Sequence, residues 1–354
     1  MKVLVTGGAG YIGSVLTRNL LRSGHEVTVL DALLFGDDSV RDLAGTTGYT
    51  LVEGDIRDET LVGRLVQGKD AVVHLAAIVG DPACAANPSV AVSVNVEGTE
   101  IAGRAAQRAK IGRFVFASTC SVYGHSDETV DESSVFNPQS LYAESRMAGE
   151  AAVQSLANRS FQPVRLRFGT VYGLSPRMRF DLVVNFLTVE LFRKGTISIF
   201  GGDQWRPFLH VADAARAVQL AVESPASLVA NEVFNTGSEE QNYQLRDLMP
   251  IYSQLRPGST VNCVREVQDR RSYRVNFDKI RRVLGFTPSF SIPRGVRQIH
   301  DALTSRALWD LDGVNHYNHK INLDRIEAAY QHEFTVPNSV PSNQLWRRRE
   351  ASAH

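Results

Sequence analysis

Short apolar runs alternate with longer, helix-like segments through the first half of the chain. The apolar runs cover residues 3–5, 26–30, 49–52, 71–75, 113–117 and 164–168, and we predict each of them to be a strand. Residues 11–22, 90–109 and 141–158 instead repeat apolar positions at helical spacing. Strands that are apolar at nearly every position are buried on both faces, and their alternation with helices is typical of parallel sheets. The pattern predicts an α/β fold with a doubly wound parallel sheet.

The pattern loosens after about residue 173, where proline, arginine and aromatic residues become frequent. We therefore predict a sheet domain over residues 1–172 and a smaller mixed α/β lobe over residues 173–304. The lobe is expected to pack against the carboxyl ends of the strands, where ligands of such sheets bind. Residues 305–354 are polar and rich in His and Asn, so we expect a surface arm or tail, with one helix at residues 323–331.

Three glycines follow the first predicted strand at a spacing that suits a dinucleotide. Gly7 permits the tight turn from strand to helix, Gly10 lets the backbone approach a pyrophosphate, and Gly13 lets the helix pack on the strand. The helix directs free N–H groups and the positive end of its dipole at the phosphates. We predict a Rossmann cofactor site built from this turn: Gly7, Gly10, Tyr11, Ile12 and Gly13.

An acidic residue at the end of the second strand indicates which dinucleotide binds. Asp31 lies eighteen residues after Gly13, where a carboxylate can accept both hydroxyls of the adenosine ribose. Its charge would repel a 2′-phosphate, and no Arg or Lys occurs at residues 32–34. These observations favour NAD over NADP. Asp55 and Ile56, after the third strand, are expected to contact the adenine.

A hydroxyl, a phenol and a cation are predicted to converge beside the nicotinamide. Thr119 follows the fifth strand, while Tyr142 and Arg146 are four residues apart and share a helix face. A nearby cation lowers the pKa of a phenol from its ordinary value of about 10. The phenolate could then take a proton from a substrate alcohol, and Thr119 could hydrogen-bond the same oxygen. The sequence therefore predicts an oxidation site at Thr119, Tyr142 and Arg146.

The composition narrows the partners. Lys plus Arg and Asp plus Glu both number 38, so no net charge favours nucleic acid or an anionic membrane. The three cysteines are widely separated and show no metal-ligand spacing, so we expect no metal and a reducing compartment. The start does not read as a signal peptide, and no apolar stretch approaches the length of a membrane span. We expect a cytoplasmic protein.

Together these motifs resemble the extended short-chain dehydrogenase/reductase superfamily, in its NAD-dependent nucleotide-sugar epimerase/dehydratase branch. The resemblance covers about residues 1–300 and is carried by residues 6–13, 74–77, 118–124 and 171–173 together with Asn95 and Tyr142. It implies tightly held NAD, with Leu75, Ala76, Ala77 and Asn95 in the cofactor site. It also implies a nucleoside-diphosphate sugar in the second lobe and a homodimer built through a four-helix bundle.

The resemblance also indicates which residues bind the sugar nucleotide. Residues 204–208 and 269–273 are similar to two family segments whose arginines grip the diphosphate, here Arg206 and Arg271. Arg177, Arg179 and Asn185 are expected to contact the substrate as well, as is Thr119. The run at residues 175–181 is similar to a sub-branch acting on unusual sugars, including heptose nucleotides.

Two departures from the family pattern bear on the reaction. Arg146 replaces the usual lysine, and arginine stays charged and cannot relay a proton to solvent. Cys120 and Ser121 stand where family 4,6-dehydratases carry Asp and Glu, which disfavours dehydration. An epimerase needs no net proton relay, so we predict a nucleotide-sugar 4-epimerase acting through transient C4 oxidation. A 4-dehydrogenase or ketoreductase, and a non-catalytic NAD-binding regulator, stay open as alternatives.

Overall fold

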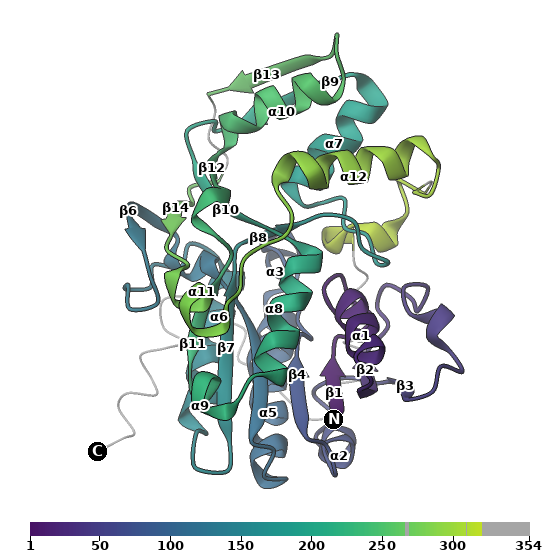
Figure 1. The fold of residues 1–354 in the computed structure, drawn as a ribbon, viewed down its shortest axis with the longest axis vertical. Coiled ribbons are helices and arrows are strands. Elements are labelled where there is room, and N and C mark those ends of the chain that lie inside the picture. The colour runs from purple at the N-terminus through teal and green to yellow at the C-terminus, as the bar shows by residue number, and fades with distance from the viewer. Residues whose placement is uncertain (266–268, 309, 321–354) are drawn as a thin grey trace.

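A seven-stranded parallel sheet forms the centre of the computed structural model, which describes residues 1–265, 269–308 and 310–320 (Figure 1). Its strands are β1 (Lys2–Thr6), β2 (Glu26–Asp31), β3 (Tyr49–Glu53), β4 (Ala71–His74), β5 (Arg113–Thr119), β7 (Gln162–Phe168) and β11 (Val233–Thr236). They lie in the order β11-β7-β5-β4-β1-β2-β3, and every neighbouring pair is parallel. The predicted fold class, a doubly wound Rossmann sheet, is confirmed.

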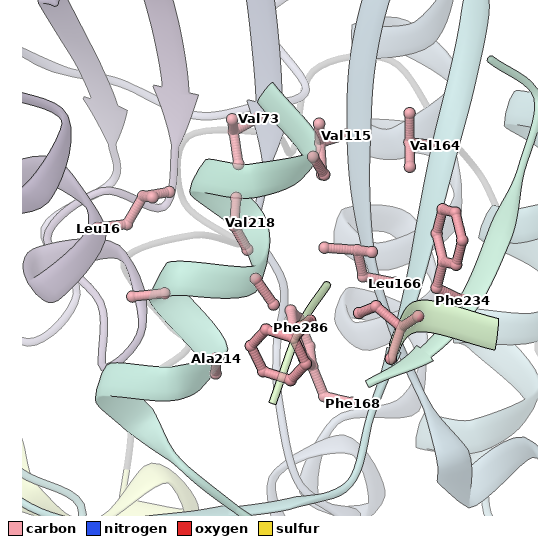
Figure 2. Packing of buried hydrophobic residues seen from close by; sticks show 14 of the residues in the cluster. Leu16, Val73, Val115, Val164, Leu166, Phe168, Ala214, Val218, Phe234 and Phe286 are labelled. Carbon is pink, nitrogen blue, oxygen red and sulfur yellow. The ribbon is translucent and has the colours of Figure 1, made fainter. Parts of the chain in front are cut away.

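Helices cover both faces of the sheet. On one face, α1 (Gly13–Arg22) and α8 (Val211–Glu223) pack on the side chains that include Val73, Val115 and Leu166, with Ala214 and Val218 of α8 directed at them (Figure 2). On the other face lie α2 (Glu59–Leu65), α5 (Gly98–Arg108) and α6 (Leu141–Ser155). Complete burial of each valine or leucine stabilises the fold by about 1.5–3 kcal/mol. Burial on both faces explains why the strands are apolar throughout.

The helix predicted over residues 90–109 is interrupted. It consists of α4 (Pro88–Val92), one π-helical turn (Ser93–Glu97) and α5, and it follows the short helix α3 (Asp81–Ala86). In the π turn, the fully buried Asn95 is directed at Ile78, to which it makes two hydrogen bonds. Gly98 opens α5 where a Cβ would lie 2.7 Å from the Ile56 side chain. Tertiary packing therefore overrides regular helix geometry at this point.

The smaller lobe lies beyond the carboxyl ends of the strands (Figure 1). Its strands and helices are β8 (Thr170–Tyr172), α7 (Val183–Lys194), β9 (Thr196–Phe200), β10 (Trp205–His210), β12 (Asn242–Gln244), α10 (Leu248–Leu255), β13 (Thr260–Val264) and α12 (Ile292–Thr304). Strands β6 (His125–Val130) and β14 (Ser272–Val275) pair with each other, and α11 (Asp278–Leu284) packs on β11. Helix α9 (Ala226–Val229) lies at the end of the central sheet that is far from the lobe (Figure 1). Beyond the central sheet there are three small sheets, with the strand orders β12-β10-β8, β13-β9 and β14-β6.

The chain returns from the smaller lobe to the central sheet. Helix α8 and strand β11 belong to the core of the sheet, although the sequence assigns residues 173–304 to the other lobe. The alanines of α8 let this helix lie close to the strands, and Phe234 of β11 is fully buried in the same cluster. The sheet is thus assembled from two separate stretches of chain.

The start of the C-terminal extension is packed rather than free, which corrects the expected surface arm for residues 310–320. Leu311 is buried with Phe180, and the backbone N–H of Phe180 donates to His316 at 2.9 Å. The Asn318 amide donates to the Val79 carbonyl at 2.9 Å, so the segment reaches the loop after β4. The helix predicted at residues 323–331 lies outside the described residues.

Across the described residues, no helix combines the length and the apolar character needed to cross a membrane.

Candidate active site

A cleft of about 870 Å³ lies between the carboxyl ends of the strands and the smaller lobe. It brings together most of the residues predicted from sequence: Gly7, Gly10, Tyr11, Ile12, Gly13, Asp31, Asp55, Ile56, Leu75, Ala76, Ala77, Thr119, Tyr142, Arg146, Arg177, Arg179, Arg206 and Arg271. These residues come from the ends of five strands, from helix α6 and from three segments of the second lobe. The cleft is therefore the candidate active site.

The glycine turn forms a cradle that a side chain would fill. Gly7 has φ +76°, and a Cβ there would lie 2.7 Å from the backbone nitrogen of Ala76. A Cβ on Gly13 would lie 2.1 Å from the Gly7 carbonyl oxygen. Helix α1 begins at Gly13, which lines the cleft, so the positive end of the helix dipole faces the cleft. The first turn of α1 has no acidic residue that would offset this charge. This cradle fits the pyrophosphate of a dinucleotide.

The two carboxylates predicted to bind the adenosine, Asp31 and Asp55, both line the cleft. Asp31 accepts hydrogen bonds from the backbone N–H groups of Ala9 and Leu33, both at 2.9 Å, one on each carboxylate oxygen. Each oxygen has a second lone pair, which could accept a ribose hydroxyl. Burial raises the pKa of Asp31 above its ordinary value, while those two N–H groups oppose the shift. Asp55 is held differently, because its two oxygens bind the guanidinium of Arg57 at 2.8 and 3.0 Å.

Thr119 and Tyr142 occupy the centre of the cleft. Thr119 ends β5, where its hydroxyl accepts the Ser121 N–H and donates to the Ser121 hydroxyl, both at 3.1 Å. Tyr142 lies in the first turn of α6, a helix capped by the Ser140 hydroxyl. Burial raises the pKa of Tyr142, and the charge of Arg146 opposes that shift. The pKa of Tyr142 is therefore above that of a free phenol, which corrects the expectation of a lowered value. The effect of Arg146 has the expected sign, but desolvation of the phenolate is larger.

Arg146 lies one turn after Tyr142 in the same helix, and it is buried, with an exposed fraction of 2%. Its Nη2 donates to the Ala117 carbonyl, and its guanidinium lies 4.5 Å from the centre of the Phe116 ring. Its Nη1 has no hydrogen-bond partner within the described part of the chain. A buried N–H without a partner is costly, so this atom suits a ligand hydroxyl such as that of the nicotinamide ribose.

Three further arginines of the smaller lobe, Arg179, Arg206 and Arg271, line the cleft. Arg206 and Arg271 both bind Asp269, at 3.1 and 2.5 Å, and Arg271 also binds Asp81 at 3.0 Å. These charges lower the pKa of Asp269 to about 2. Arg179 is paired with Asp181 at 2.8 Å. The pairs hold cationic groups at the cleft wall, where a diphosphate could bind them bidentately.

Two predicted ligands are not brought to the cleft. Asn95 donates to the Ile78 carbonyl and to the Ser145 hydroxyl and accepts the Ile78 N–H, so its amide holds the loop after β4 in place. Asn185 accepts the Gly173 N–H and donates to the Tyr11 hydroxyl and the Arg179 carbonyl. Both side chains are fully buried. Each of them holds backbone segments next to the cleft in place, and we do not propose that either residue contacts the cofactor or the substrate.

Several cleft residues were missed by the sequence reasoning. Phe186 and Phe200 line the cleft with exposed fractions of 46% and 42%, as large apolar groups that the fold leaves uncovered. Asp81 and Asp269 also line it and organise the arginines. The apolar pattern gave no signal for the two phenylalanines, because a ligand-facing ring and a core ring look alike in sequence.

Comparison with known proteins agrees with this geometry. The family model described as "NAD dependent epimerase/dehydratase family" matches residues 3–237. A dTDP-glucose 4,6-dehydratase of Streptomyces niveus is 33% identical over 326 residues, covering 88% of this chain and 95% of the relative. A UDP-glucose 4-epimerase of Streptomyces lividans is 33% identical over 244 residues, covering 62% and 71%.

A solved structure is similar over nearly the same extent. The UDP-glucuronic acid 4-epimerase of Bacillus cereus, in complex with UDP-glucuronic acid and NAD, superposes with a TM-score of 0.78 at 27% identity. The match covers 86% of this chain and all of that one. The chain belongs to the NAD-dependent epimerase/dehydratase family of the extended short-chain dehydrogenase/reductase fold. NAD is its cofactor, as Asp31 and the glycine cradle predict.

Proposed function

We propose that the protein is an NAD-dependent nucleotide-sugar 4-epimerase acting through a transient 4-keto sugar. The observation that carries the proposal is the environment of Thr119 and Tyr142. The thiol of Cys120 is fully buried and donates to the Arg167 carbonyl at 3.2 Å, away from the cleft. Ser121 contributes only a hydroxyl. The centre thus offers groups for proton transfer at one sugar hydroxyl, with no carboxylate from residues 120 and 121.

The chemistry divides between the cofactor and this chain. Bound NAD supplies the hydride acceptor and, in the return direction, the donor. Tyr142, as phenolate, takes the proton of the sugar 4-hydroxyl, and the Thr119 hydroxyl donates a hydrogen bond to the same oxygen. Arg146 keeps a fixed positive charge next to the phenolate. Its Nη1, which has no partner among the described residues, would bond a hydroxyl of the ribose. After the 4-keto sugar rotates and presents the opposite face of C4 to the bound cofactor, Tyr142 returns the proton to the 4-oxygen.

The remainder of the sugar nucleotide is proposed to lie along the smaller lobe. Arg206 and Arg271 would bind the diphosphate in place of part of their contact with Asp269. Phe186 and Phe200 offer exposed rings for the nucleobase. The relatives named for UDP-glucose, UDP-glucuronic acid and dTDP-glucose share this general substrate class. A homodimer, expected from the family resemblance, remains part of the proposal.

The main rival is dehydration, the activity named for the Streptomyces niveus relative. Loss of water next to a 4-keto group needs an acid and a base placed along the sugar, and Cys120 and Ser121 provide no carboxyl group there. Arg146 separates the remaining alternatives. A permanently charged arginine cannot deliver the proton to solvent, whereas a net oxidation must release one. Epimerisation returns the proton within the site, so it is the reaction these residues suit.

A panel of nucleotide sugars deuterated at C4 tests the proposal. The purified protein is incubated with each sugar, and products are followed by NMR, by mass spectrometry and by the absorbance of NADH. We expect a product inverted at C4 that keeps its deuterium, without accumulation of NADH. A keto product with stoichiometric NADH would identify a dehydrogenase, and a product lighter by one water would identify a dehydratase. Tight NAD binding without turnover of any sugar would leave the regulator.

A further inference from the structure

The segment after β8 is fastened directly to the glycine turn. The Tyr11 hydroxyl donates to the Gly173 carbonyl at 2.6 Å, and the Ser175 hydroxyl donates to the Tyr11 carbonyl at 2.7 Å. The Ser14 and Ser175 hydroxyls are 3.3 Å apart. Residues 173–175 of the second lobe therefore lie against the first turn of α1. Arg177 follows two residues later, next to the phosphate cradle.

Arg177 is a buried cation that forms no ion pair with any residue in the described part of the chain. Its exposed fraction is 6%, and its guanidinium lies 3.7 Å from the centre of the Phe35 ring. Among the residues that the structure describes, nothing accepts a hydrogen bond from its Nε or Nη2. Burial lowers the pKa of Arg177 to about 9, and the nearby charges of Asp31 and Asp181 only partly oppose that shift. A buried charge with unmet donors is costly unless a ligand completes it.

We propose that Arg177 binds the pyrophosphate of NAD and forms the second half of its phosphate site. Two neighbours fix the identity of the anion. Asp31 marks the adenosine ribose, and Tyr11 lies in the glycine turn, so Arg177 borders the path between ribose and pyrophosphate. The Nε and Nη2 atoms form a fork that suits two phosphate oxygens. This assignment moves Arg177 from the substrate, where the sequence placed it, to the cofactor.

The sugar nucleotide is a less suitable ligand for this arginine. Arg206 and Arg271 lie with Asp269 and Ser121, whereas Arg177 lies with Phe35 and the turn at Tyr11. The neighbouring Arg179 already has a bidentate carboxylate partner in Asp181. Within the described structure, Arg177 is the member of this pair whose fully buried donors, Nε and Nη2, have no hydrogen-bond partner. The cofactor phosphate is therefore the anion within its reach.

The test compares Arg177→Gln with wild-type protein, using ligands that differ in phosphate. Binding of NAD, ADP and adenosine is measured by calorimetry on cofactor-free protein. We expect Arg177→Gln to weaken NAD and ADP by about 10- to 100-fold and to leave adenosine nearly unchanged. The melting temperature of the cofactor-free variant should equal or exceed that of wild type, because an unpaired buried charge is removed. A merely structural arginine would lower it.

Controls keep the proposal falsifiable. Arg165→Gln removes another arginine with an unpartnered Nε, on β7 and outside the cleft lining, and should leave all three affinities unchanged. If Arg177→Gln fails to fold, Arg177→Lys keeps the charge without the fork and should show an intermediate loss for NAD and ADP. Wild-type affinity for NAD in either variant overturns the proposal. So does a loss for adenosine as large as that for NAD and ADP, which would mean that the arginine does not act through the phosphates.

Discussion

At the scale of single residues, the proposed chemistry depends on one phenol. Tyr142 lies at the start of α6, in the cleft that also contains Thr119 and the glycine cradle. We expect Tyr142→Phe to lower kcat by about 10²- to 10⁴-fold, because the group that takes the proton is removed. The affinity for NAD and the melting temperature should change little, since the Tyr142 hydroxyl makes no hydrogen bond to any of the described residues. Turnover at the wild-type rate would contradict the role of this phenol.

The pH dependence follows from the raised pKa of Tyr142. The reaction needs phenolate, so we expect kcat to rise with pH into the alkaline range. Arg146 is the largest influence that opposes the shift, and Arg146→Gln should move the rise to still higher pH. Arg146→Lys keeps a cation and should return the rise in kcat to the pH range of the wild-type protein. Identical pH–rate profiles for all three proteins would contradict the proposed role of Arg146.

The same shift has a consequence for stability. The folded protein disfavours the phenolate, so the stability from the buried neutral phenol is present below the unfolded value of about 10. It is lost as pH rises through the folded pKa. Catalysis and stability therefore respond in opposite directions to alkaline pH. Because both effects follow from ionisation of the same Tyr142 hydroxyl, raising the pH should increase kcat while it lowers the free energy of unfolding.

At the scale of elements, Asn95 joins the π-helical turn to the loop after β4. We expect Asn95→Leu to lower the free energy of unfolding by about 1–3 kcal/mol for each backbone group of Ile78 that it leaves buried and unpaired. Urea unfolding measures the change. Ser89→Ala, at an exposed position in the neighbouring α4, should stay within about 0.5 kcal/mol of wild type. Equal effects from both variants would contradict the proposed clamp.

The elements also show what the sequence could predict. The apolar runs located six strands of the sheet, because burial on both faces leaves a local signal, and the glycine spacing located the cradle. β11 and α8 were assigned to the other lobe, since nothing local in residues 211–236 indicates which core they join. The places of Asn95 and Asn185 outside the cleft lining could not be predicted for a related reason. A buried amide clamp and a ligand differ only in tertiary contacts, such as those of Tyr11 with Gly173 and Asn185.

At the scale of the whole molecule, the two halves are joined on both sides of the cleft. On the cofactor side, the Tyr11 hydroxyl bonds the Gly173 carbonyl. On the substrate side, Arg271 of the smaller lobe binds Asp81 at the start of α3. Residues 310–320 add a third connection through Asn318 and Val79. The cleft thus has separate structural supports for its two proposed ligands, and their affinities can be altered one at a time.

Arg271 offers the test of that separation. We expect Arg271→Gln to weaken UDP or dTDP by about 10- to 100-fold, because a charge-assisted contact to the diphosphate is lost. The affinity for NAD should stay near that of wild type, since Arg271 contacts Asp269 and Asp81 and not the glycine turn or Asp31. Arg281→Gln, an exposed change on α11, serves as the matched control. Equal losses for the nucleotide and for NAD would mean that the Asp81 contact supports the whole cleft, and that the two ligand sites are not independent.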